Sequence, residues 1–222
     1  FFDIDGTMLS TGGAGQRAME LALTEEFCLE FPFEGVLTAG RTDRGIADEI
    51  FARYGLVDTP LERLRFMQTY LDRLPGVLES LPGALLPGVL ELLDQLHRAP
   101  DVYLSLLTGN YVEGAWIKLR HFGIDHYFET GGFGDDHAHR DDVARLAADN
   151  VRGHLKRELP DGSTCVIGDT PADIRCARAI NARAVAVATG MYSSEQLQPH
   201  APDHLFEDLR DTVLVARSLM GL

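Results

Sequence analysis

The chain opens with Phe1-Phe2-Asp3-Ile4-Asp5-Gly6-Thr7, an apolar strand-like run that ends in two carboxylates and a turn. Asp3 and Asp5 are two positions apart, and a turn at Gly6 lets both side chains reach one pocket. One carboxylate can bind a hard cation and attack an electrophile, while the other gives and takes a proton. The ordinary alternative is a surface turn, since Asp and Gly are common in turns.

A second segment with this layout is Leu106-Leu107-Thr108-Gly109-Asn110. A hydroxyl group and free backbone N–H groups ahead of a helix can hold a phosphate. Thr108 or Asn110 can equally be an ordinary helix N-cap.

The third segment is Val166-Ile167-Gly168-Asp169-Thr170-Pro171-Ala172-Asp173. Asp169 ends an apolar strand, and Asp173 follows one helical turn later, so both can face one cation. The alternative is a carboxylate pair that stabilises the helix dipole.

Short apolar strands alternate with helical patterns along most of the chain, which predicts a parallel α/β sheet covered by helices on both faces. The expected strands are residues 1–4, 102–107, 127–131, 164–167, 184–188 and 204–206. The expected helices between and after them are residues 87–98, 111–122, 141–157, 171–179 and 208–220.

Between residues 12 and 85 the patterns are helical only, over 15–27, 42–54 and 60–74, followed by a turn-rich return linker at 75–83. This predicts an all-helical domain, residues 12–85, inserted after the first strand through a Gly12-Gly13 hinge. The core then comprises residues 1–11 and 86–222. The insert is expected over the carboxyl ends of the strands, where α/β proteins bind ligands.

Composition excludes several classes of protein. The net charge of −14 disfavours nucleic-acid and anionic-membrane partners, and no apolar run reaches the length of a membrane span. Three cysteines without close spacing are typical of reduced thiols in a cytoplasmic protein. No protein partner is predicted.

With its three motifs in this order, the sequence resembles the haloacid dehalogenase superfamily, in particular its phosphatase branch. That family's pattern is Asp-x-Asp-Gly-Thr, then Ser or Thr, then Lys or Arg, then Gly-Asp-x-x-x-Asp. The resemblance implies a three-layer Rossmann-like core with a helical cap. It also implies a Mg²⁺-dependent hydrolase that acts on a small phosphorylated metabolite through an aspartyl-phosphate.

The resemblance also implies roles for individual residues. Asp3 would be the nucleophile and Asp5 the general acid and base. The Mg²⁺ site would comprise Asp3, the backbone carbonyl of Asp5, and Asp169, with Asp173 orienting it. The groups that hold the phosphoryl oxygens would be Thr108, Gly109, Asn110 and Arg140.

Arg140 is assigned to the family's basic position because it lies between Thr108 and Asp169, just ahead of a helix. The family more often has Lys there. The chain's two lysines, Lys118 in mid-helix and Lys156 near a helix end, are expected to be dispensable.

Two other clusters are weaker candidates. Arg41 and Arg44, in the loop at 38–44, could bind a second anionic group on the leaving group, or be ordinary surface residues. His137 and His139 could bind zinc, but four ligands with suitable spacing are not evident, and a polar loop at the pocket mouth is the favoured interpretation.

Alternative activities stay open to different degrees. Asp5 counts against a carbon–halogen hydrolase, and the absence of lysine from residues 12–85 counts against a phosphonate hydrolase. A sugar-phosphate mutase resembling β-phosphoglucomutase has the same core motifs. An inactive interaction module is disfavoured because every motif is filled. Phosphoglycolate is the first substrate expected from general resemblance.

Overall fold

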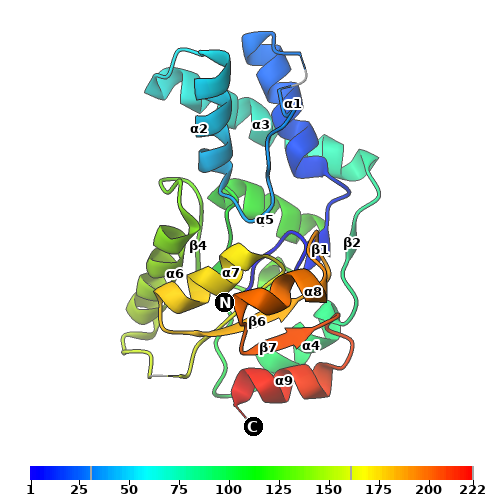
Figure 1. Ribbon diagram of the computed structural model, residues 1–222, viewed down its shortest axis with the longest axis vertical. Coiled ribbons are helices and arrows are strands. Elements are labelled where there is room, and N and C mark those ends of the chain that lie inside the picture. Colours follow the sequence, from blue (N-terminus) through cyan, green and yellow to red (C-terminus); the bar gives the residue numbers. More distant parts are fainter. Residues whose placement is uncertain (31, 161, 222) are drawn as a thin grey trace.

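A parallel sheet forms the centre of the protein in this computed structural model, which describes residues 1–30, 32–160 and 162–221 (Figure 1). Its strands are β3 (Leu106–Leu107), β4 (Gly131–Gly132), β5 (Cys165–Gly168), β6 (Arg183–Val187) and β7 (His204–Phe206). Phe2 bridges β3 and β5, so the order is β4, β3, the Phe2 segment, β5, β6 and β7.

Helices cover both faces of this sheet. They are α4 (Val89–His97), α5 (Val112–His121), α6 (Arg140–Leu155), α7 (Pro171–Ala179), α8 (Ser194–Leu197) and α9 (Thr212–Met220). Successive strand residues alternate between two buried clusters, as the pleat requires. Ile167 packs with α4, α5 and α9, and Val166 packs with α6 and α7. The predicted α/β fold with a parallel sheet is therefore confirmed.

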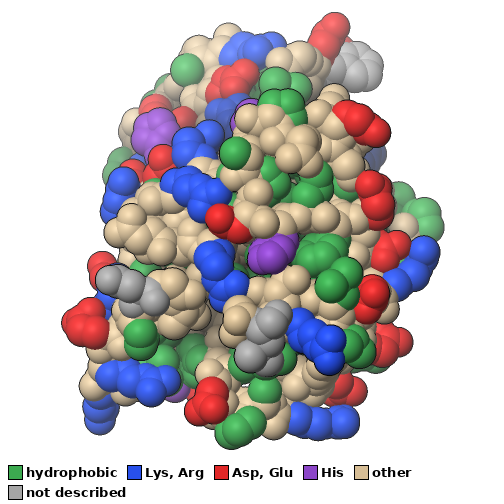
Figure 2. Space-filling view, turned by 60° about the horizontal axis from the view of Figure 1, so that its bottom comes forward, with side chains coloured by type: hydrophobic (Ala, Val, Ile, Leu, Met, Phe, Trp, Pro, Cys, Tyr) green, Lys and Arg blue, Asp and Glu red, His purple; other side chains and the backbone are tan. Residues whose placement is uncertain are grey.

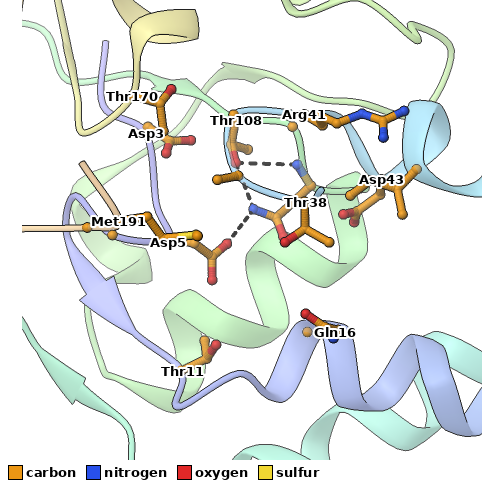
Figure 3. A pocket seen from close by; sticks show the side chains of 18 of the residues that line it. Asp3, Asp5, Thr11, Gln16, Thr38, Arg41, Asp43, Thr108, Thr170 and Met191 are labelled. Carbon is orange, nitrogen blue, oxygen red and sulfur yellow. Dashed lines mark hydrogen bonds between the residues drawn. The ribbon is translucent and has the colours of Figure 1, made fainter. Parts of the chain in front are cut away.

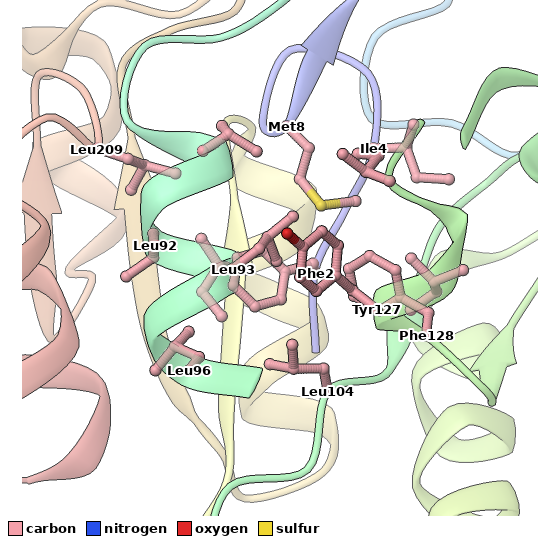
Figure 4. Packing of buried hydrophobic residues seen from close by; sticks show 14 of the residues in the cluster. Phe2, Ile4, Met8, Leu92, Leu93, Leu96, Leu104, Tyr127, Phe128 and Leu209 are labelled. Atoms are coloured by element: carbon pink, nitrogen blue, oxygen red, sulfur yellow. The ribbon is translucent and has the colours of Figure 1, made fainter. Parts of the chain in front are cut away.

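Figure 4 shows the first of these clusters at the sheet's central segment. Phe2, Ile4 and Met8 pack against Leu92 and Leu93 of α4, and all five are buried. Burial of Phe2, Ile4 and Met8 therefore fixes the segment that carries Asp3 and Asp5.

Three further helices, α1 (Ala14–Phe27), α2 (Asp43–Tyr54) and α3 (Pro60–Ser80), form what we call the helical insert. They share a buried cluster of their own, which includes Phe51, Phe66 and Tyr70. Figure 1 shows the insert beyond one end of the sheet. The division into a core and a separate domain over residues 12–85 stays a prediction.

The segment that leads into the helical insert pairs with the segment that leads out of it. β1 (Leu9–Ser10) runs antiparallel to β2 (Ala84–Leu85), with Leu9 opposite Leu85. Sequence patterns did not predict this ribbon. Gly12 and Gly13 follow it with φ angles of 63° and 89°, a left-handed conformation that glycine adopts without strain.

Several predicted elements differ from the structure. The expected strand at 102–107 is only β3 at Leu106–Leu107, and the expected helix at 208–220 begins only at Thr212. The expected linker at 75–83 is wrong over its first two thirds, because α3 continues through Pro75 to Ser80. Burial of Val77 and Leu78 in the insert's cluster offsets the helix hydrogen bond that proline removes. The expected strand at 127–131 is a 3₁₀ turn at Asp125–Tyr127, and β4 begins only at Gly131.

On the face shown in Figure 2, acidic, basic and hydrophobic side chains are mixed. No helix among the described residues is long and apolar enough to cross a membrane. Cys165 and Cys176 are buried free thiols, and Cys28 is an exposed one.

Candidate active site

The backbone of the first motif belongs to the centre of the sheet. The N–H of Asp3 donates to the carbonyl of Ile167 at 3.0 Å, and the N–H of Leu107 donates to the carbonyl of Phe2 at 2.8 Å. Since the three strands are parallel, Asp3, Thr108 and Asp169 leave the sheet at the same edge. All three are buried.

Asp3, Asp169 and Asp173 form a compact carboxylate cluster. One oxygen from each lies within 4.8 Å of the other two, which makes this the one group of three or more possible metal ligands within residues 1–30, 32–160 and 162–221. Thr7 donates a 3.1 Å hydrogen bond to Asp169, and Thr170 donates a 2.7 Å bond to Asp173. Each carboxylate is thus held in place from the protein side.

Electrostatics in the cluster favour a cation. Burial raises the pKa of Asp3 above its ordinary value, with Asp173 and Asp5 adding to the rise and Arg140 opposing it. Burial also raises the pKa of Asp169, followed by the charges of Asp173 and Asp3. Crowded carboxylate oxygens suit a hard divalent cation such as Mg²⁺, which would relieve this repulsion.

Arg140 lies where the sequence predicts, at the first residue of α6. Its guanidinium is buried and binds Asp3 at 3.0 Å and also Asp173. Its Nε is buried without a hydrogen-bond partner among the described residues.

The loop after β3 links the second motif to Asp5. The Asn110 side-chain amide donates to Thr108 Oγ1 at 2.7 Å and to Asp5 Oδ2 at 2.9 Å (Figure 3). The Thr108 oxygen therefore accepts, which leaves its O–H free to donate. A Cβ at Gly109 would lie 2.1 Å from the carbonyl oxygen of Arg41, so only glycine lets the helical insert approach this closely.

Lys118 is a site residue that the sequence analysis missed. Its Nζ lies 2.6 Å from Asp5 Oδ2 and 2.6 Å from Asn110 Oδ1, and its side chain is 4% exposed. The structure places Lys118 among the site residues, which argues against the expectation that it is dispensable. A lysine on the buried stripe formed by Ala115 and Leu119 was the available signal. Lys156 is exposed at the end of α6.

The two predicted arginines of the helical insert are both bonded within the protein, although Arg41 also lines the cavity described below. Arg41 forms an ion pair with Glu49 and donates to the carbonyl of Gly45 at 2.7 Å. Figure 3 shows its guanidinium directed away from Asp3 and Asp5. Arg44 donates a 3.4 Å hydrogen bond to the carbonyl of Asp135, and is not among the residues that line the cavity.

A cavity of about 480 Å³ lies between the sheet edge and the helical insert. Asp3, Asp5 and Thr108 line it from the sheet side. From the insert come Gln16, Met19, Phe33, Thr38, Asp43, Ile46 and Tyr70. His137 and His139 do not line it.

Comparisons with known proteins agree with this geometry. A probable phosphatase of Dickeya dadantii is 24% identical over 100% of this chain and 94% of that protein. A phosphoglycolate phosphatase of Caulobacter vibrioides is 28% identical over 95% of this chain and 86% of that protein. The crystal structure of a hydrolase from Pseudomonas syringae, 21% identical, superposes with a TM-score of 0.74 over 98% of this chain and 97% of that one.

The family model of haloacid dehalogenase-like hydrolases matches residues 1–178, a stretch that contains the strand-end carboxylates, Arg140 and the whole helical insert. The fold and the order of these residues along the chain agree with that match. This chain therefore belongs to the haloacid dehalogenase-like hydrolase family.

Proposed function

We propose that this protein is a Mg²⁺-dependent phosphatase that hydrolyses a small phosphate monoester through an aspartyl-phosphate on Asp3. The observation that carries the proposal is the convergence of Asp3, Asp169 and Asp173 with Arg140 at one sheet edge, beside the cavity that the helical insert also lines. Relatives named as phosphatases support it.

In the first step, an Asp3 carboxylate oxygen forms a bond to phosphorus as the bond to the leaving oxygen breaks. Arg140 holds the other oxygen of Asp3 at 3.0 Å, which fixes the direction of attack. The Thr108 hydroxyl binds phosphoryl oxygens, and the positive charge of Arg140 stabilises them. These fixed groups stabilise the charge that develops in the transition state.

Asp5 transfers the protons. One of its oxygens is held by Lys118 and Asn110, and the side chain is 40% exposed towards the cavity, so the other oxygen can reach the leaving group. It protonates the leaving oxygen in the first step. In the second step it removes a proton from the water that attacks the phosphoryl group and releases Asp3.

The residues proposed to hold Mg²⁺ are Asp3, Asp169 and Asp173, together with the backbone carbonyl of Asp5. Bound there, the ion would neutralise charge on the phosphoryl oxygens. The raised pKa values of Asp3 and Asp169 support this fit, since a cation stabilises their ionised forms.

Phosphate release measures the proposed activity directly. Purified protein with Mg²⁺ and p-nitrophenyl phosphate should release inorganic phosphate, and Asp3→Asn should lower turnover by orders of magnitude while the protein stays folded. A phosphoryl label trapped on any residue other than Asp3 would refute the assignment.

The same assay separates the alternative activities. Phosphoglycolate, whose leaving group carries a carboxylate, is tested beside neutral esters, because the relative from Caulobacter vibrioides is named for it. A sugar-phosphate mutase would instead convert β-glucose 1-phosphate to glucose 6-phosphate with little phosphate release. An inactive interaction module would release none from any ester.

A further inference from the structure

A buried tyrosine of the helical insert lines the cavity. Tyr70 is fully buried, and its hydroxyl, which makes no hydrogen bond of normal geometry among the described residues, lies beside the Asp43 side chain. Its ring is held by stacking on Phe66 at 6.5 Å between centroids. Leaving a buried hydroxyl unpaired is costly, so a protein keeps one where a ligand supplies the partner.

Asp43 lies at the same end of the cavity. Its Oδ2 accepts the backbone N–H of Tyr111 at 2.9 Å, and its own N–H donates to Gly109 at 2.7 Å. These bonds fix the carboxylate, which lines the cavity. In Figure 3, Asp43 and Asp3 stand on opposite sides of the cavity, so Asp43 faces the leaving group rather than the attacked phosphorus.

The cations that line this cavity are all committed. Lys118 is paired with Asp5, Arg140 with Asp3 and Asp173, and Arg41 with Glu49. Lys118 partly offsets the charge of Asp43 but is itself paired with Asp5, so a leaving group with a carboxylate or a second phosphate would meet Asp43 without an unpaired cation among the described residues that line the cavity. Like charges in a partly desolvated site repel each other strongly.

We propose that Asp43 and Tyr70 form a subsite for a neutral, polyhydroxylated leaving group and reject leaving groups that carry an anionic substituent. Tyr70 donates to a substrate hydroxyl oxygen, and Asp43 accepts from a substrate O–H. Gln16 and Thr38, which also line the cavity, offer further polar groups. The inference rests on the proposed phosphatase activity and specifies its substrate class.

The test compares two substrates that differ at one carbon. Sorbitol 6-phosphate ends in CH₂OH where 6-phosphogluconate ends in a carboxylate. At pH 7.5, above the pKa of Asp43, which burial raises to about 6, Asp43 is ionised. The wild-type protein should show a kcat/KM at least about tenfold higher for sorbitol 6-phosphate, one decade being the effect of about 1.4 kcal/mol of repulsion.

Two variants assign this preference to the subsite. Asp43→Asn removes the charge but keeps an oxygen for the Tyr111 N–H, and should reduce the preference for sorbitol 6-phosphate. Tyr70→Phe should lower the ratio of kcat/KM for sorbitol 6-phosphate to that for p-nitrophenyl phosphate about three- to tenfold, the usual effect of one neutral hydrogen bond.

Tyr111→Phe is the matched control. Tyr111 belongs to the same buried cluster, 6.1 Å from Tyr70 between ring centroids, but does not line the cavity. Its variant should keep the wild-type ratio.

The outcomes separate the inference from the proposed function. No phosphate release from any ester, p-nitrophenyl phosphate included, would overturn the proposed function. Phosphate release with 6-phosphogluconate equal or preferred, or with the preference unchanged in Asp43→Asn, would overturn the subsite alone. A Tyr111→Phe variant that changed the ratio as much as Tyr70→Phe would also overturn it, because the effect would then come from the packing of the insert.

Discussion

Replacing Arg140 by Met should destabilise the metal-free protein far more than replacing an exposed arginine of the same helix. Arg140 is buried and is shared by Asp3 and Asp173. Removing one partner of a buried ion pair costs about 3–5 kcal/mol. For a chain of this size, that lowers the melting temperature by about 6–20 °C.

The loss should depend on pH, and its sign follows from the carboxylates. The folded-state pKa values of Asp3 and Asp169 are raised by burial above the ordinary value of 3.8, so the folded protein binds protons more tightly than the unfolded chain. The stabilisation that protonated Asp3 and Asp169 contribute is complete below pH 3.8 and is lost as the pH rises through their folded-state pKa values. Arg140 lowers both pKa values, so its removal should cost more at pH 8 than at pH 5.5.

Thermal unfolding in EDTA at the two pH values measures this difference. Arg145→Met is the control, because Arg145 lies on the same helix in an exposed pair with Asp142, where such pairs contribute about 0–1 kcal/mol. Equal small losses for the two variants, or an Arg140→Met loss that does not change with pH, would refute the electrostatic reasoning.

Three further predictions concern activity. Lys118→Met should lower kcat by at least about tenfold, because Asp5 loses a charged hydrogen bond, while the exposed control Lys156→Met should match wild type; similar rates for both would place Lys118 outside the mechanism. EDTA should abolish phosphate release, Mg²⁺ should restore it and Ca²⁺ should not, because Ca²⁺ adopts a looser coordination geometry; turnover that persists in EDTA would contradict the metal assignment. Gly190→Ala should raise the Mg²⁺ concentration needed for half-maximal activity, since a Cβ there would lie 1.7 Å from Asp169 Oδ2; an unchanged Mg²⁺ titration would mean that Asp169 is not a ligand.

The sequence predicted a parallel sheet with flanking helices, because these elements leave local patterns, but it missed the bounds of several strands. Helix α7 has the predicted bounds, since Pro171 sets its first turn and Thr170 caps it. The ribbon of β1 and β2 left no such pattern. Two-residue strands are too short for an alternation to be visible, and their pairing joins segments far apart in the chain.

The site residues also divide into those that a local sequence pattern predicts and those that only the folded arrangement brings to the site. Asp3, Asp169 and Arg140 each stand beside an element boundary, so their place at the sheet edge could be predicted from the order of elements. Lys118 lies within a helix, and only the orientation of α5 brings its amine to Asp5. The partner of Arg41 could not be predicted either, because Glu49 reaches it only after the loop has folded onto α2.

The pairing of Leu9 with Leu85 holds the two ends of the helical insert together in a ribbon separate from the parallel sheet. Closing the stretch between them costs an entropy that grows only slowly with its length, so helices can be added or exchanged there without disturbing strand register. Substitutions in this stretch that keep the bonds of Asp43 to Gly109 and Tyr111 are therefore expected to change substrate preference more than phosphoryl transfer.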